Sequence, residues 1–219
     1  MAEEHTGSEP EVAIYRSVIF GNFLQPLTSA VHALVKRSRE SVEWKTNELD
    51  LDWILSGILL AVAMFEGALR WTHVNKYPTS TVEGWYLYRD LRRANAALPD
   101  VREAFVLRNA IAHGHVWDVP ITNSPIDRLK LKLRLGRQDS LWKQYVDMRL
   151  GQTTPSGLHV VPTLMNRDDF KHVLEIVVAA MEALIAAELL LPQALSNVAV
   201  WPHDGERLTL RELPSRFAV

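Results

Sequence analysis

Two long apolar runs constrain the fold of this chain more than any other feature of its sequence. Residues 53–69 and 176–191 are almost entirely apolar, and each run contains acid, Glu66 in the first and Glu182 and Glu188 in the second. A membrane-spanning helix needs about 20 consecutive apolar residues, and both runs fall short of that length. We therefore expect no membrane insertion, and we expect both runs to form buried helices of a helical domain.

The composition is that of a globular protein, and it excludes several kinds of site. Of the 219 residues, 24 are Lys or Arg and 26 are Asp or Glu, so the formal net charge is −2. This balance argues against a general affinity for polyanions, which usually requires a basic excess. The chain contains no cysteine. Disulfides, thiolate zinc sites, iron–sulfur clusters and cysteine nucleophiles are therefore excluded.

The two ends of the chain show little periodic pattern. Residues 1–10 are acidic and polar and lack the basic and apolar regions of a signal peptide, so we expect a disordered N-terminus and a cytoplasmic location. Residues 192–219 contain Pro202, Gly205 and Pro214 and are expected to be irregular. At this size we expect residues 1–219 to form a single domain.

Five segments show the spacing of apolar residues that is typical of helices. Pro26 lies inside the first segment and should kink or split that helix. The last segment is apolar around most of its circumference, so we expect it to be the most central helix. In chain order the segments are residues 11–39, 50–74, 80–98, 100–114 and 166–185.

Polar residues mark the start of four of these helices. Asp50 can cap the first turn of the second segment. At the start of each of the three later segments, a capping residue is followed three positions later by an acid, which is the spacing of a capping box. These pairs are Ser80 with Glu83, Asp100 with Glu103, and Asn166 with Asp169.

A β-containing insertion is expected at residues 118–165, between the fourth and fifth helices. Over residues 129–135, leucines alternate with basic residues, which predicts a half-buried strand. Residues 141–150 could form a partner strand or a short helix, residues 151–157 a loop, and residues 158–161 a third strand. The predicted fold is therefore mainly α, an up-and-down bundle of about five helices with a small antiparallel β insertion.

The fourth helix carries the residues that could perform chemistry. Phosphate-binding glycine loops, GxGxxG, HExxH and GxSxG motifs are all missing from the sequence. In contrast, the end of the helix reads Arg108-Asn109-Ala110-Ile111-Ala112-His113. Arginine is permanently charged and its planar fork matches phosphate oxygens, whereas histidine titrates in the range needed for proton transfer. This pairing predicts chemistry on a phosphate group that requires neither a metal nor a cofactor.

This six-residue stretch resembles the R-x4–6-H motif of the HEPN superfamily, in which a polar residue, often Asn, follows the Arg. The resemblance covers the helical parts on either side of the insertion. It implies an all-α bundle of four or five helices that is usually dimeric. Many members are metal-independent endoribonucleases whose paired motifs meet across a twofold axis, and several act as toxins or in phage defence. Other members bind nucleotides or RNA without cleaving, and this alternative stays open.

Helical geometry suggests that one copy of the motif makes an incomplete site. At about 100° per residue, Arg108 and His113 project roughly 140° apart, whereas Asn109 and His113 share a face. A homodimer would supply a second copy of each residue. Arg108 could instead pair with a buried acid such as Glu66, and His113 could be an interior histidine. His115 forms an H-x-H pair with His113, but no third ligand is nearby in the sequence, so we expect no metal.

Two basic clusters could contact RNA despite the balanced net charge. We expect one on the third helix and one on the outer face of the predicted strand, where such clusters would supply phosphate contacts. Each could instead be a solvated charged face, or on the strand a guard against edge aggregation. RNA, a second copy of the chain, and an antitoxin or other regulatory protein are the expected partners. The basic residues are Arg89, Arg92, Arg93, Lys130, Lys132 and Arg134.

Overall fold

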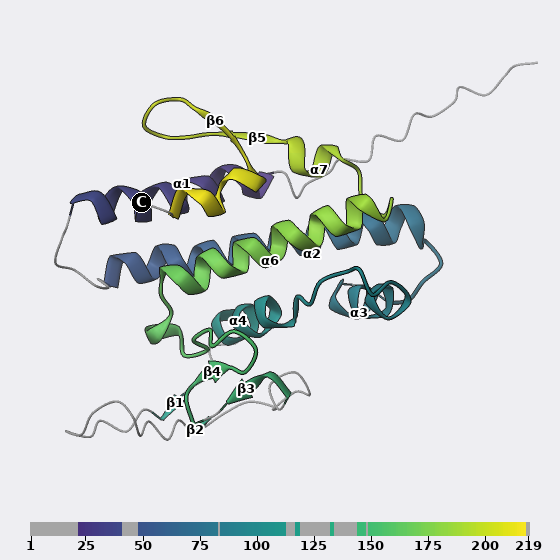
Figure 1. Cartoon of the computed structure of the whole chain (residues 1–219), viewed down its shortest axis with the longest axis horizontal. Helices are drawn as coiled ribbons and strands as arrows, with labels where there is room; N and C mark the ends of the chain where they lie inside the picture. The colour runs from purple at the N-terminus through teal and green to yellow at the C-terminus, as the bar shows by residue number, and fades with distance from the viewer. Residues whose placement is uncertain are drawn as a thin grey trace, which may run out of the picture.

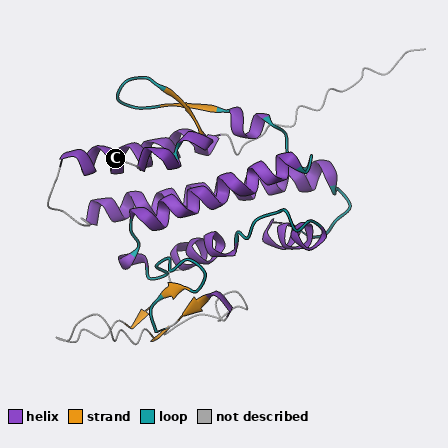
Figure 2. Ribbon diagram, viewed as in Figure 1, coloured by secondary structure: helices purple, strands orange, loops and turns teal. Residues whose placement is uncertain are grey.

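The chain is mainly helical, with small antiparallel strand pairs, as the apolar spacing predicts. The computed structural model describes residues 22–40, 48–82, 84–112, 117–118, 132–133, 144–147 and 149–217. Figures 1 and 2 show three layers: α1 with the C-terminal segments, then α2 and α6, then α3 and α4 with the strands of the insertion. The longer helices are α1 (Leu24–Glu40), α2 (Glu48–Lys76), α3 (Gly84–Ala94), α4 (Arg102–Ala112) and α6 (Arg167–Ala186).

Helix α2 is the centre of the packing. It packs against α1, α3, α4 and α6, whereas α6 packs mainly against α2 and α4 among the longer helices. The expectation that the last long helix is the most central is therefore wrong. The apolar pattern along α6 indicates that several of its sides are buried, but it does not predict how many helices cover those sides.

The length of α2 also corrects the argument about membrane insertion. This helix has 29 residues, and within the described part of the chain its stretch Asp50–Lys76 is the one helix long and apolar enough to cross a membrane. The core helix of a water-soluble protein meets the same criterion. In the most apolar window of Asp50–Lys76, 44% of the residues are buried within the chain. Length alone therefore gives weak support to a membrane location.

A glycine allows α2 and α6 to approach closely. A Cβ atom placed on Gly57 of α2 would lie 2.3 Å from Cζ of Phe170 on α6, and within 2.7 Å of two further ring atoms. Phe170 is fully buried, so its ring has little room to move. Any larger side chain at position 57 would therefore push the two helices apart.

Asp50 joins three helices and does not cap α2, contrary to the sequence-based expectation. It lies in the first turn of α2 and its side chain is 5% exposed. Oδ1 lies 3.0 Å from Nε of Arg37 on α1, and Oδ2 accepts a hydrogen bond of 2.7 Å from Nη2 of Arg167 on α6. A carboxylate buried this deeply is stable only when it is paired, and here two arginines pair with it.

Two other helix starts differ from the sequence-based expectation. Helix α1 begins at Leu24, so Pro26 lies in its first turn, where a missing N–H costs little, and it splits no described helix. Helix α3 begins at Gly84 and not at Ser80. Oγ of Ser80 instead accepts a hydrogen bond of 3.1 Å from the N–H of Val82 in the preceding turn. Residue 83, the other half of the expected capping box, and residues 11–21 of the first predicted helix lie outside the described residues.

Of the two remaining capping boxes, one forms and one does not. The Asn166 side chain accepts from the N–H groups of residues 168 and 169, and the Asp169 carboxylate accepts from the N–H of Asn166, which confirms the box at the start of α6. At α4, Oδ1 of Asp100 accepts from the N–H of Arg102 at 3.0 Å. Glu103 is buried and binds residues of the insertion instead, so the expected box at this helix is wrong.

The insertion contains two short antiparallel pairs within its described residues. Strand β1 (Trp117–Asp118) pairs with β2 (Lys132–Leu133), and β3 (Val146–Asp147) pairs with β4 (Gln152–Thr153). The predicted strand at 129–135 is thus represented by β2, and its other residues lie outside the described chain. The predicted third strand at 158–161 is reduced to a single bridge between residues 152 and 159.

The C-terminal segment is regular, so the expectation of an irregular tail is wrong. Helix α7 (Gln193–Ser196) precedes a hairpin of β5 (Val198–Val200) and β6 (Arg207–Thr209), and two 3₁₀ turns follow, η4 (Leu210–Glu212) and η5 (Pro214–Phe217). Ala199 and Leu208 face inward from the two strands and are buried. The Gln25 amide of α1 bonds both the N–H and the C=O of Val200, which fixes the hairpin on that helix. Two of the residues that suggested irregularity, Pro202 and Gly205, lie in the hairpin turn, where Gly205 has φ of 74°, and the third, Pro214, begins η5.

Gly57→Ala should destabilise the protein even though alanine is the better helix former by about 1 kcal/mol. The added methyl group meets the buried Phe170 ring, so overpacking should outweigh this gain and lower the free energy of unfolding by about 0.5–2 kcal/mol. Urea denaturation measures this change. Ser56→Ala, on the exposed side of the same turn, is the control and should change stability by less than about 0.5 kcal/mol. A more stable Gly57→Ala protein would contradict the close packing.

Asp50→Asn should lower the free energy of unfolding by about 2–4 kcal/mol, because it leaves two arginines facing each other without their anion. Thermal and urea unfolding both measure the loss. Asp52→Asn removes a charge from the exposed neighbouring position and should be nearly neutral. Equal stability of the two variants would show that the buried ion pairs do not hold the three helices together.

Candidate functional site

Arg108 is held from two directions at the interface of α4 and α2. Its Nη2 donates to Oε1 of Glu66 on α2, and its Nη1 donates to Oδ1 of Asn109 at 2.8 Å. The guanidinium carbon lies 5.5 Å from the ring centroid of Phe105, one turn earlier on α4. The Arg108 and Glu66 side chains are 25% and 37% exposed. The guanidinium is therefore fixed in orientation and still reachable from solvent.

The bond to Asn109 changes the geometry expected from the helical wheel. Arg108 leaves α4 on its apolar arc, but its guanidinium bonds the side chain of the next residue. Asn109 is four positions before His113 in the sequence, a spacing that places two helical residues on one face. The charged end of Arg108 is thereby directed toward the Asn109 side of α4. Its Nε is buried and donates to no described residue, a cost that the rest of the contacts must offset.

The structure places only part of the predicted motif. Helix α4 ends at Ala112. His113 and His115 lie outside the described residues, so the geometry of Arg108 with His113 stays a prediction. The alternative pairing of Arg108 with Glu66 is confirmed. This ion pair both orients Arg108 and partly neutralises it.

The predicted basic clusters differ in how free their side chains are. On α3, the side chains of Arg89 and Arg93 are 40% and 71% exposed and both contact Asp90. Arg92 instead donates to the carbonyl of Leu98 at 3.2 Å and so holds the connection between α3 and α4. In the insertion, Lys132 is described only as part of the β2 backbone, and Lys130 and Arg134 lie outside the described residues.

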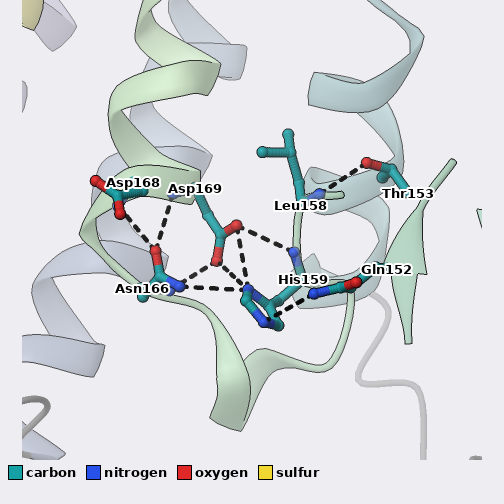
Figure 3. A network of polar contacts seen from close by, with 7 residues as sticks. All are labelled: Gln152, Thr153, Leu158, His159, Asn166, Asp168 and Asp169. Carbon is teal, nitrogen blue, oxygen red and sulfur yellow. Dashed lines mark hydrogen bonds and ion pairs between the residues drawn. The ribbon is translucent and has the colours of Figure 1, made fainter. Parts of the chain in front are cut away.

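A second polar cluster, which sequence reasoning missed, surrounds the buried carboxylate of Asp169 (Figure 3). The N–H of His159 donates to Oδ1 at 3.0 Å, and Nδ1 of the same residue lies 3.1 Å from Oδ2. Nε2 of His159 lies 3.2 Å from the Gln152 amide. The sequence revealed Asp169 as a capping residue, but nothing in the spacing pointed to a histidine ten positions earlier.

The pKa of His159 is raised from its ordinary value, chiefly because its imidazolium form hydrogen-bonds Asp169. Partial burial opposes the shift, and the negative charge of Asp169 adds to it. The imidazole could move a proton, but its Nε2 already faces the Gln152 amide. The arrangement therefore fits an anchor between the insertion and α6 better than a catalytic base.

Glu103 provides the other anchor of the insertion. Its buried carboxylate accepts from the Thr153 hydroxyl and from both the N–H and the hydroxyl of Ser156, at 3.1 and 2.8 Å for Ser156. The Arg102 guanidinium lies over the Tyr145 ring, 4.1 Å from its centroid. The insertion is thus fastened to the first turns of both α4 and α6. No group of three or more His, Asp or Glu side chains within the described residues could hold a metal ion.

Comparisons with known proteins found no relative of this chain. No family model matches the chain, and no curated protein or solved structure shows a significant match. The motif on α4 and the contacts around it are therefore the features that bear on function.

The stabilising effect of His159 should depend on pH. A folded-state pKa above the ordinary value of 6.5 gives a contribution that is complete below about pH 6.5 and is lost as the pH rises through the raised pKa. The difference in unfolding free energy between the wild type and His159→Gln should therefore be largest near pH 5.5 and should shrink toward pH 8.5. Urea denaturation across this range measures it. A difference that stays constant would contradict an ion pair between His159 and Asp169.

Proposed function

We propose that this protein is a HEPN-type, metal-independent endoribonuclease that acts as a cytoplasmic homodimer, with its longer helices forming a HEPN-like bundle. The observation that carries the proposal is the fixed orientation of Arg108. Its guanidinium is bonded to Asn109 and to Glu66, and its motif partner His113 follows one turn after Asn109 in the sequence. A planar cation held in advance is what stabilisation of a transferring phosphate requires.

The proposed reaction is attack by the 2′-hydroxyl of RNA on the adjacent phosphate. A base removes the 2′-proton, the oxygen bonds phosphorus, and the bond from phosphorus to the 5′-oxygen breaks as an acid protonates that oxygen. His113 would act as base or acid. Arg108 would stabilise the negative charge of the phosphorane, and Asn109 would help to place the phosphate. The products carry a 2′,3′-cyclic phosphate and a 5′-hydroxyl.

The outer side of α2 supports the proposed dimer. Leu59, Ala63 and Glu66 have the spacing of one helical face, and all three are only partly buried in the described part of the chain. This face places two apolar side chains beside the acid that holds Arg108, and a second copy could cover it. Two Arg108 sites would then lie near the same interface. Other apolar residues of α2 that are exposed or only partly buried are Leu51, Trp53, Leu55, Leu60, Trp71 and Val74.

The part of a bound RNA that lies outside the site would contact the basic clusters. The biological role would be that of a toxin or a phage-defence effector. Such an enzyme needs control, so a cognate antitoxin or another regulatory protein is part of the proposal. Arg89 and Arg93 on α3 have exposed side chains that could bind phosphate. Lys130, Lys132 and Arg134 of the insertion would add to this surface, and Arg92 would contribute mainly by holding α3 to α4.

One observation favours a second candidate, a non-catalytic HEPN module that binds RNA, a nucleotide or a protein partner. Glu66 pairs with Arg108 and competes with phosphate for the same guanidinium. In such a module Arg108 would bind phosphate only weakly or would hold the fold. Phosphate or nucleotide binding that depends on Arg108, without any turnover of RNA, would support this candidate over the nuclease.

The purified protein should cleave RNA in excess EDTA, and Arg108→Ala and His113→Ala should each reduce the rate about 10²- to 10⁴-fold. Gel analysis of a labelled RNA measures the rate, and circular dichroism checks that each variant is folded. Arg207→Ala, which removes an exposed arginine of β6, is the matched control and should cleave normally. Cleavage that survives both motif substitutions, or that needs a divalent cation, would overturn the proposal.

A further inference from the structure

Helix α3 presents an aromatic and basic face on the side away from the core. Its inner side buries Leu87, Tyr88 and Leu91. On the opposite side, Tyr86 is 60% exposed, and the side chains of Arg89 and Arg93 are 40% and 71% exposed. Positions 86, 89 and 93 have the i, i+3, i+7 spacing of one helical face. We call these three residues the α3 face.

The three side chains form one continuous surface with an excess of positive charge. The Arg89 guanidinium lies 5.2 Å from the centre of the Tyr86 ring, so the ring already supports a flat cation. Asp90 contacts Arg89 at 3.1 Å and Arg93 at 3.4 Å, which leaves two arginines against one aspartate on this face. A surface of this kind suits a ligand that has both flat rings and negative charge.

Ring contacts connect α3 to the candidate site. The ring of Trp85, which precedes Tyr86, lies 5.4 Å from that of Phe105 on α4. Phe105 in turn lies 5.5 Å from the Arg108 guanidinium. Phe105 is buried, so these contacts run through the interior and pack α3 against the helix that carries Arg108.

We infer that the α3 face binds unpaired RNA, with Tyr86 stacking on a base and Arg89 and Arg93 contacting phosphates. Every base has a flat face, so stacking on tyrosine tolerates any sequence but needs a base that is free of its partner strand. A double helix offers phosphates but hides those base faces. This inference rests on the proposed function, since it assigns to the α3 face the binding of an unpaired segment of the same RNA.

The test measures binding separately from cleavage. The probe is a fluorescent single-stranded RNA with 2′-O-methyl groups, which cannot undergo 2′-hydroxyl attack, and fluorescence anisotropy gives Kd for the full chain. Tyr86→Ala should weaken binding about 5- to 100-fold, whereas Tyr86→Phe should bind within about 3-fold of the wild type. Arg93→Ala should weaken binding and reduce its salt dependence, and Arg207→Ala should do neither. A duplex of the same sequence should bind more weakly and should be insensitive to Tyr86→Ala.

The outcomes distinguish this inference from the proposed function. Equal affinity of the wild type and Tyr86→Ala for the single strand would overturn the inference, whether or not the protein cleaves RNA. Failure of the wild type to bind any RNA would also overturn it and would direct attention to a protein partner for the α3 face. Binding that depends on Tyr86, in a protein that cleaves no RNA, would support the inference while the nuclease proposal fails.

Discussion

Burial of α2 is the constraint on which the rest of the structure depends. An apolar helix of 29 residues cannot be left in water, and α1, α3, α4 and α6 each cover part of it. The close packing of Gly57 against Phe170 fixes α6 against it, and the ion pairs of Asp50 fix both α1 and α6. Glu66 lies on a partly covered side of α2 and pairs with Arg108, so the packing of this helix also decides where Arg108 is held.

The insertion is attached through the same helix starts that organise the domain. Glu103 in the first turn of α4 and Asp169 in the first turn of α6 are buried acids, and each accepts hydrogen bonds from residues of the insertion. Acids are favoured at helix N-termini by the partial positive charge there. Here they also hold a segment that begins directly after the motif on α4. The insertion is therefore attached to two helices of the bundle.

Helices could be predicted from the sequence, whereas the polar contacts between them could not. Apolar periodicity located all five longer helices, because burial on one side repeats every three to four residues along the chain. Acids at the helix starts were predicted to be caps or members of capping boxes. For Asp50 and Glu103 this was wrong, because partners far along the chain bind their carboxylates in place of a local N–H group. The C-terminal hairpin was missed because strands of three residues leave no periodic signal. At the candidate site, the pairing of Arg108 with Glu66 could be anticipated from an acid in an apolar run, but the bond to Asn109 could not.

Arg108, Asn109 and Glu66 form the described half of the proposed site, and the reaction assigned to it leaves a chemical signature. The most direct measurement is the identity of the ends that the protein leaves on RNA in EDTA, determined by mass spectrometry of the fragments. Attack by the 2′-hydroxyl predicts 2′,3′-cyclic phosphate and 5′-hydroxyl ends. Fragments with 3′-hydroxyl and 5′-phosphate ends, or intact RNA at every protein concentration, would contradict the account.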